Sequence, residues 1–219
     1  LIRRQRQMCI RDRATGNDTF HAWPSRNDWY ETIKLNYGID YLGGRVSHFD
    51  PVPSTWEKMT QILLFWAKKG VDAFRCDMAE MVPAEFWSYA TSKVKAQYPH
   101  IQFIAEVYNP AEYRRYIASG FDYLYDKVGL YDTLRAIVCN GASASCITSC
   151  WQSVDDIREH MLNFLENHDE QRIASPFFAG DAKKALPALV VSSMMGNAPF
   201  MVYACLLYTS DAADELDGV

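Results

Sequence analysis

The sequence predicts a parallel α/β fold of the (β/α)8 barrel type, and three apolar runs carry this prediction. Each run has the composition of a buried parallel strand and leads to charged side chains. The runs are residues 71–77 ending on Asp77, residues 101–107 with Glu106, and residues 161–166 followed by Asp169. These carboxylates are 29 and 63 residues apart, about one and two strand–helix repeats of such a barrel. Because all barrel strands point the same way, the three carboxylates are expected to meet at the C-terminal face.

The first helix of this pattern is expected over residues 54–69. Ser54-Thr55-Trp56-Glu57 has the form of a capping box at its start, and Gly70 is placed to end it. Apolar residues at helical spacing predict the face that packs against the sheet. They are Trp56, Met59, Leu63, Trp66 and Ala67.

Later segments continue the alternation of strand and helix. Pro83 suits the first turn of a second helix, whose inner face is predicted at Phe86, Ala90 and Val94. The pattern then predicts the strand at 101–107, a short helix over 110–120, a strand over 121–125 and a helix over 130–138. A loop over 140–155 leads to the strand at 161–166. After that strand come a helix, a turn and the start of a last strand, which covers residues 199–203.

Residues 185–210 contain no charged side chain, as in a membrane helix. Pro187, Gly196 and Pro199 divide the stretch into pieces shorter than the roughly 20 apolar residues that a spanning helix needs. The sequence therefore predicts no membrane partner.

Composition narrows the class of protein further. With 49% hydrophobic and 14% aromatic residues, the chain can bury a core, which we expect to be a single domain. A formal net charge of −5 argues against a nucleic-acid partner and suits a neutral sugar. No C-x-x-C pair is present, so we expect free thiols and no metal site at the internal cysteines, which are Cys76, Cys139, Cys146 and Cys150.

The two ends do not fit this pattern. Residues 1–13 carry five Arg without helical or strand periodicity, and residues 205–219 interrupt the last strand pattern with an acidic run. Both resemble translated sequencing-adapter read-through, and we exclude them from the fold prediction. A basic nucleic-acid arm and an acidic tail are the alternatives. With the true N-terminus missing on this interpretation, the compartment stays open between bacterial cytoplasm and periplasm.

Four motifs together resemble one enzyme family. Phe74-Arg75-Cys76-Asp77, Ala105-Glu106-Val107 and Asn167-His168-Asp169 match, in order, spacing and strand-end position, the second, third and fourth sequence regions of the α-amylase family of glycoside hydrolases (family 13). Ile33-Lys34-Leu35-Asn36 resembles the fifth region in neopullulanase- and cyclomaltodextrinase-like members. The resemblance implies that residues 54–204 form roughly strands 4 to 8 of a (β/α)8 catalytic barrel. Residues 14–53 would end the lobe that follows strand 3.

The resemblance also implies a role for each motif residue. Asp77 would be the nucleophile of a retaining mechanism, and Glu106 the general acid and then the base. Asp169 would bind and distort the sugar ring. Arg75 and His168 would contact the same substrate, Arg75 also orienting Asp77. The expected substrates are α-glucan oligosaccharides with α-1,4 or α-1,6 bonds.

This chain departs from the family pattern in two respects. The first sequence region lies upstream and is absent, so the part-barrel is expected to aggregate or stay inactive through its open edges. Glu80 and Met81 stand where true α-amylases often have Lys-His. The residues present therefore do not support a calcium site, and no other cofactor is expected.

Three alternatives compete with an α-amylase-type hydrolase. A glucanotransferase, or a sucrose- or trehalose-type isomerase, would use the same carboxylates with different acceptor loops. A catalytically inert carbohydrate-binding homologue would be expected to lack a carboxylate, and all three are present. An unrelated barrel hydrolase using two Glu is disfavoured by the pairs Arg75/Asp77 and His168/Asp169.

Overall fold

The computed structural model describes residues 15–20, 25–29 and 32–203. The expectation that residues 1–13 and 205–219 are read-through sequence lies outside these residues. The described chain forms an α/β fold around a four-stranded parallel sheet with strand order β3-β4-β5-β6. The strands are β3 (Ala73–Cys76), β4 (Gln102–Ala105), β5 (Tyr123–Tyr125) and β6 (Met161–Leu162).

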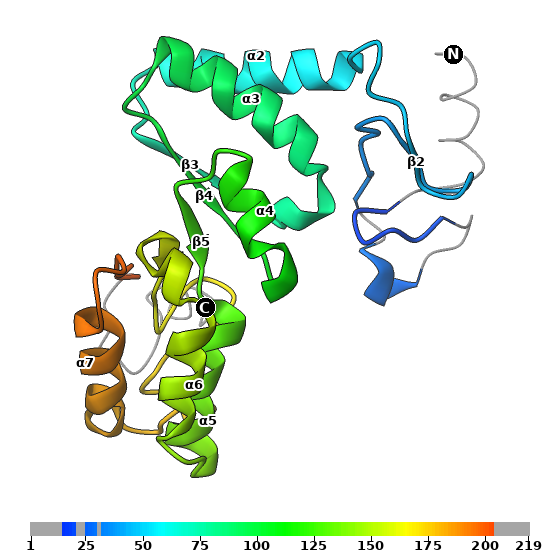
Figure 1. Ribbon diagram of the computed structural model, residues 1–219. Helices are drawn as coiled ribbons and strands as arrows, with labels where there is room; N and C mark the ends of the chain where they lie inside the picture. The colour runs from blue at the N-terminus through cyan, green and yellow to red at the C-terminus, as the bar shows by residue number, and fades with distance from the viewer. Residues whose placement is uncertain (1–14, 21–24, 30–31, 204–219) are drawn as a thin grey trace, which may run out of the picture.

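Helices pack around this sheet. They are α2 (Ser54–Lys68), α3 (Ala84–Gln97), α4 (Tyr113–Ala118), α5 (Asp132–Asn140), α6 (Cys146–Ser153) and α7 (Leu186–Met194). Figure 1 shows α2 and α3 side by side at one end, and α5, α6 and α7 grouped at the other. The π-helical turn Lys127–Tyr131 leads into α5.

Two clusters of buried side chains follow this division. The first joins β3 and β4 to α2, α3 and α4 through side chains such as Phe86 and Phe103. The second joins β5 and β6 to α5 and α7 through side chains such as Phe164. The rings of Phe103 and Phe121 lie edge to face at 6.3 Å, a favoured geometry for aromatic packing.

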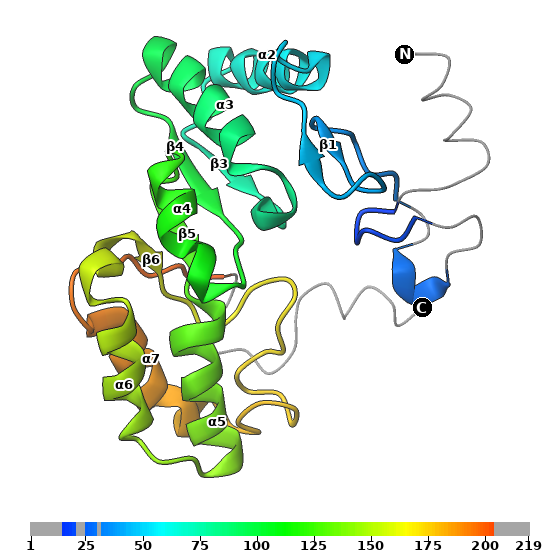
Figure 2. The same ribbon diagram turned by 45° about the vertical axis from the view of Figure 1, so that its right-hand side comes forward.

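A small lobe precedes the sheet and lies beside α2 and α3 (Figure 2). It contains the antiparallel pair β1 (Ile39–Asp40) and β2 (Val46–Ser47). Aromatic contacts fasten it to the helices, with Phe49 5.0 Å from Trp56 and Tyr37 4.7 Å from Phe86 between ring centroids. The Ile33–Asn36 motif lies in this lobe, where Lys34 pairs with Asp18.

The first helix confirms part of its prediction and corrects the rest. Gly70, at φ +91°, follows its last turn as expected. The capping box was wrong, because the residue before the helix is Pro53, and Ser54 already lies within α2. The inward placement of Trp66 was also wrong, since 51% of its surface is exposed. At 100° per residue, Ala67 returns to the face of Trp56, whereas Trp66 lies about 80° away.

The segment around β6 differs most from the prediction. The predicted loop 140–155 contains helix α6, which its Ser- and Cys-rich composition concealed. The strand expected over 161–166 is limited to Met161–Leu162, followed by a single parallel bridge from Asn163 to Phe200. That bridge is all that forms of the strand expected over 199–203 within the described residues. Among those same residues, no helix is both long and apolar enough to cross a membrane.

Candidate active site

Arg75 is the side chain around which the predicted site residues gather. It lies in β3, and its guanidinium hydrogen-bonds the carboxylate of Asp77 just beyond the strand. The same guanidinium lies 3.0 Å from Oε2 of Glu106 and 3.8 Å from Oδ2 of Asp169. Carboxylates that follow β3, β4 and β6 therefore face one cation. His168 joins this set through Nε2, which lies 3.2 Å from Oδ2 of Asp169.

The three carboxylates differ in exposure. Glu106 is buried, with 3% of its surface exposed, whereas the Asp77 and Asp169 side chains are 76% and 49% exposed. A ligand can thus reach Asp77 and Asp169 directly from solvent. Glu106 is instead enclosed by protein groups that hydrogen-bond its carboxylate.

Glu106 receives a donor at each of its oxygens. The backbone N–H of Met78 donates to Oε2 at 2.9 Å, beside the contact with Arg75. Met78 adopts a left-handed conformation, φ +41°, in the turn that follows Asp77. The hydroxyl of Tyr108 donates to Oε1 at 2.5 Å. These bonds offset the cost of burying the carboxylate.

Burial and charge act in opposite directions on the pKa of Arg75 and in the same direction on the pKa of Tyr108. Burial disfavours the charged guanidinium of Arg75, but the hydrogen bond to Asp77 and the charge of Glu106 outweigh it and raise the pKa of Arg75. Burial, and then the hydrogen bond and charge of Glu106, raise the pKa of Tyr108 above its ordinary value. Both groups therefore remain protonated donors at neutral pH.

The loop that carries Asp169 is anchored from beneath. Asn167 Oδ1 accepts hydrogen bonds from the backbone N–H groups of Asp169 and Glu170, both at 2.9 Å. Below this turn, the fully buried Glu166 pairs with Arg172 at 2.9 Å and accepts the N–H of Ile173 at 2.7 Å. Hydrogen bonds and an ion pair within the segment thus fix the turn that carries Asp169.

A second tether reaches the same loop from the π-helical turn. Lys127 Nζ lies 3.1 Å from Oε1 of Glu170, and the Tyr131 hydroxyl donates to its Oε2 at 2.8 Å. The segment after β5 therefore holds the segment after β6 through the neighbour of Asp169.

Two residues of the site were missed from the sequence. Tyr108 follows Glu106 by two positions, and in an extended chain that spacing puts both side chains on one side. Glu80 accepts the backbone N–H groups of Tyr108 and Asn109 at 3.2 and 3.1 Å. Only the first of these contacts had a local signal, because the second joins segments 28 residues apart.

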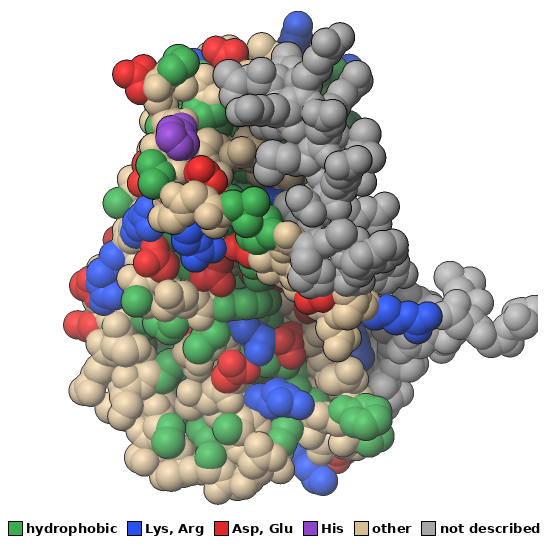
Figure 3. All heavy atoms as spheres, turned by 90° about the vertical axis from the view of Figure 1, so that its right-hand side faces the viewer, with side chains coloured by type: hydrophobic (Ala, Val, Ile, Leu, Met, Phe, Trp, Pro, Cys, Tyr) green, Lys and Arg blue, Asp and Glu red, His purple; other side chains and the backbone are tan. Residues whose placement is uncertain are grey.

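The described residues also bear on metal binding and on surface charge. Within residues 15–20, 25–29 and 32–203, no group of three or more His, Cys, Asp or Glu side chains is arranged to hold a metal ion. The cysteines Cys76, Cys139, Cys146 and Cys150 are free thiols. Figure 3 shows basic and acidic side chains interspersed over the described part of one face.

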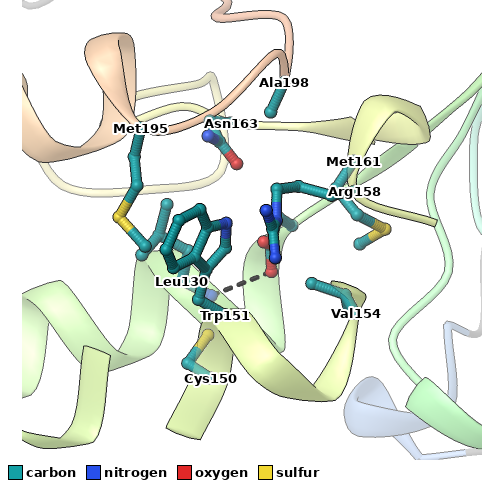
Figure 4. Close-up of a pocket in the computed structure, with 10 residues that line it drawn as sticks. Leu130, Cys150, Trp151, Val154, Arg158, Met161, Asn163, Met195 and Ala198 are labelled. Carbon is teal, nitrogen blue, oxygen red and sulfur yellow. Dashed lines mark hydrogen bonds between the residues drawn. The ribbon is translucent and has the colours of Figure 1, made fainter. Parts of the chain in front are cut away.

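Two cavities are lined in part by residues of α6. The first has about 10 Å³, room for one water, between Trp151, Arg158 and Asn163 (Figure 4). There the Arg158 guanidinium lies 3.8 Å from the Trp151 ring centroid. The second, of about 600 Å³, is open and is lined by residues of α4, the π-helical turn and α6, including Tyr113 and Cys150. Neither cavity is lined by a predicted site residue.

Sequence comparison finds relatives that are named for activities on α-glucans. The chain is 27% identical over 166 residues to alpha-amylase 3 of Dictyoglomus thermophilum, covering 69% of this chain and 32% of that protein. It is 34% identical over 162 residues to the alpha-1,4-glucan:maltose-1-phosphate maltosyltransferase of Rhodospirillum rubrum, covering 67% and 22% respectively. No protein-family model matches the chain.

Structural comparison finds the same fold in solved amylases. An alpha-amylase from Lactobacillus plantarum superposes with a TM-score of 0.65 at 24% identity, over 84% of this chain and 43% of that one. An alpha-amylase from Geobacillus thermoleovorans, solved with acarbose, gives 0.57 at 21% identity, over 72% and 37%. At these identities the likeness shows the fold alone.

Fold and site together define an α/β protein whose parallel strands lead to a carboxylate cluster at their C-terminal ends. By sequence and by structure, its relatives are members of the α-amylase family, glycoside hydrolase family 13, which confirms the resemblance noted in the sequence. The chain is thus homologous to glycosidases and to transferases of that family. It spans 32% or less of the two curated relatives described above.

Proposed function

We propose that the protein is a retaining α-glucan hydrolase of the α-amylase family. The observation that carries this proposal is the convergence of Asp77, Glu106 and Asp169 on the guanidinium of Arg75. Asp77 and Glu106 are bound by the same guanidinium, which favours the short separation, about 5–5.5 Å, that retaining glycosidases require. Residues 54–204 would form part of a (β/α)8 barrel, and residues 14–53 the end of its lobe.

The environments of the two carboxylates suit different roles. Asp77 is exposed and paired with a cation, which suits a carboxylate that attacks the anomeric carbon of a bound sugar. Glu106 is buried and hydrogen-bonded at both oxygens, which fixes its position for proton transfer. Asp169 and His168 would bind hydroxyls of the same sugar ring.

Transfer in place of hydrolysis is the second candidate. It is favoured by the 34% identity to a maltosyltransferase, against 27% to an alpha-amylase. Both reactions share a glycosyl-enzyme intermediate and differ in the acceptor that attacks it. Maltotriose distinguishes them, because hydrolysis yields only shorter sugars whereas transfer also yields longer ones. Maltose 1-phosphate as donor tests the maltosyl transfer named for the relative.

The test uses the full-length protein with α-1,4-glucan oligosaccharides. Glu106→Gln is expected to lower kcat/KM by roughly 10²–10⁴-fold, and Asp77→Asn should reduce turnover at least as far. The matched control is Glu159→Gln, at a side chain that is 76% exposed, which should retain wild-type activity. Activity within a few-fold of wild type in both site variants would contradict the assignment. An inert carbohydrate-binding homologue would bind maltotriose without turnover in the unmutated protein.

A further inference from the structure

The two oxygens of Glu106 have partners of different chemical kinds. Oε2 faces the N–H of Met78 and the guanidinium of Arg75, and neither group can accept a hydrogen bond. Oε1 faces the hydroxyl of Tyr108 at 2.5 Å, and a hydroxyl can either donate or accept. A proton on Oε2 would point at two donors. A proton on Oε1 keeps every contact, with the Tyr108 hydroxyl as acceptor.

Glu80 holds the backbone that carries this hydroxyl. Its two carboxylate oxygens accept the N–H groups of Tyr108 at 3.2 Å and Asn109 at 3.1 Å. Glu80 is itself fixed, because its carbonyl accepts the hydroxyl of Tyr116 at 3.1 Å. Its neighbour Ala79 donates its N–H to the carbonyl of Glu106 at 2.9 Å. The turn after Asp77 and the segment after Glu106 are thereby bound together.

We propose that Tyr108 and Glu80 are positioning residues for proton donation by Glu106: Tyr108 directs the proton to Oε1, and Glu80 fixes Tyr108. This inference rests on the proposed function. In the first step the Oε1–H bond of Glu106 breaks as an O–H bond forms on the glycosidic oxygen. The electron pair of the broken C–O bond leaves with that oxygen while Asp77 forms the ester. The Tyr108 hydroxyl then turns from accepting to donating and stabilises the new carboxylate of Glu106.

This mechanism predicts a loss of activity that depends on the leaving group. A sugar leaving group needs a proton, whereas an acidic phenol departs almost without one. Tyr108→Phe is therefore expected to lower kcat/KM for maltotriose by roughly 10- to 150-fold, as for loss of a hydrogen bond to a charged group. For a nitrophenyl α-maltoside, kcat/KM should stay within about threefold of wild type. The alkaline limb of the maltotriose pH profile should also move to higher pH, because a donor to the ionised form is removed.

Controls separate positioning from folding. Tyr89→Phe removes another tyrosine hydroxyl, one that contacts Lys93 on α3. This variant should keep the wild-type kcat/KM for both substrates. Glu80→Gln keeps one acceptor oxygen and replaces the other by a donor. It should show the same leaving-group dependence as Tyr108→Phe, at smaller size. The double variant should lose less than the product of the single losses, because both residues act through one hydroxyl.

Glu106→Gln distinguishes failure of this inference from failure of the proposed function. If Glu106→Gln leaves maltotriose turnover unchanged, the proposed function is wrong. A second outcome overturns the positioning role alone. In that outcome Glu106→Gln shows the leaving-group dependence, but Tyr108→Phe lowers kcat/KM equally for both substrates or for neither. Thermal unfolding of each variant identifies a loss of activity that arises from misfolding, because misfolding lowers kcat/KM for both substrates together.

Discussion

The buried pair beneath the Asp169 loop allows a quantitative test of the structure. Arg172 pairs with Glu166 at 2.9 Å, where Glu166 is fully buried and Arg172 is 7% exposed. Replacing Arg172 by Met removes the guanidinium and leaves the carboxylate in the interior without that cation. Breaking a buried pair in this way costs about 3–5 kcal/mol, because the charge has lost its compensation but cannot return to water.

The expected loss can be measured by urea unfolding followed by circular dichroism. For a chain of this size, 3–5 kcal/mol corresponds to a fall in Tm of roughly 6–20 °C. The double variant Glu166→Gln/Arg172→Met should recover much of the loss. It removes the buried charge, while the amide oxygen can still accept the N–H of Ile173, as Oε1 does at 2.7 Å.

An exposed ion pair provides the control. Arg114 contacts Asp156 at 2.6 Å, with both side chains more than half exposed, and Arg114→Met should leave the urea midpoint near that of the wild type. Equal losses for Arg114→Met and Arg172→Met would refute the reasoning. A double variant at Glu166 and Arg172 that is less stable than Arg172→Met alone would refute it as well.

Two further outcomes follow from packing and burial. Gly120→Ala should destabilise the protein by about 1–3 kcal/mol more than Gly141→Ala in urea unfolding. Both glycines have positive φ, but a Cβ at Gly120 would lie 2.3 Å from Thr91 Oγ1 while one at Gly141 meets nothing within 4 Å, so equal losses would contradict the packing. Burial raises the pKa of Cys150 to about 11, so its alkylation rate should keep rising with pH up to that value. Peptide mass spectrometry at pH 8 should show the exposed Cys146 alkylated first, and equal rates would contradict the burial of Cys150.

The strand-end carboxylates were predictable because a buried parallel strand is recognisable in the sequence as a short apolar run that ends on charged residues. Residues 73–76 and 102–105 form strands within the predicted runs, and each is followed by a predicted carboxylate. The position of Arg75 two residues before Asp77 indicated their contact. That Arg75 also faces Asp169 could not be read from spacing, because it depends on where the loop after β6 folds back.

The errors arose where local composition and tertiary context disagree. Helix α6 is rich in Ser, Cys and Thr, which are weak helix formers. It packs against α5 and against the π-helical turn. The strand pattern at 161–166 continues in composition but not in pairing. Glu166 turns inward to Arg172, while Asn163 bridges to Phe200. The role of Glu80 in holding Tyr108 likewise depends on a contact between distant segments.

The π-helical turn Lys127–Tyr131 makes the length of its segment as consequential as its composition. A π turn closes its hydrogen bond over one residue more than an α turn, and here the N–H of Tyr131 donates to the carbonyl of Asp126 at 3.1 Å. Lys127 and Tyr131, at the two ends of the turn, both bind the carboxylate of Glu170. A related chain one residue shorter here would keep both side-chain types, but it would not close the same turn. The number of residues therefore bears on the tether to the Asp169 loop as directly as their types do.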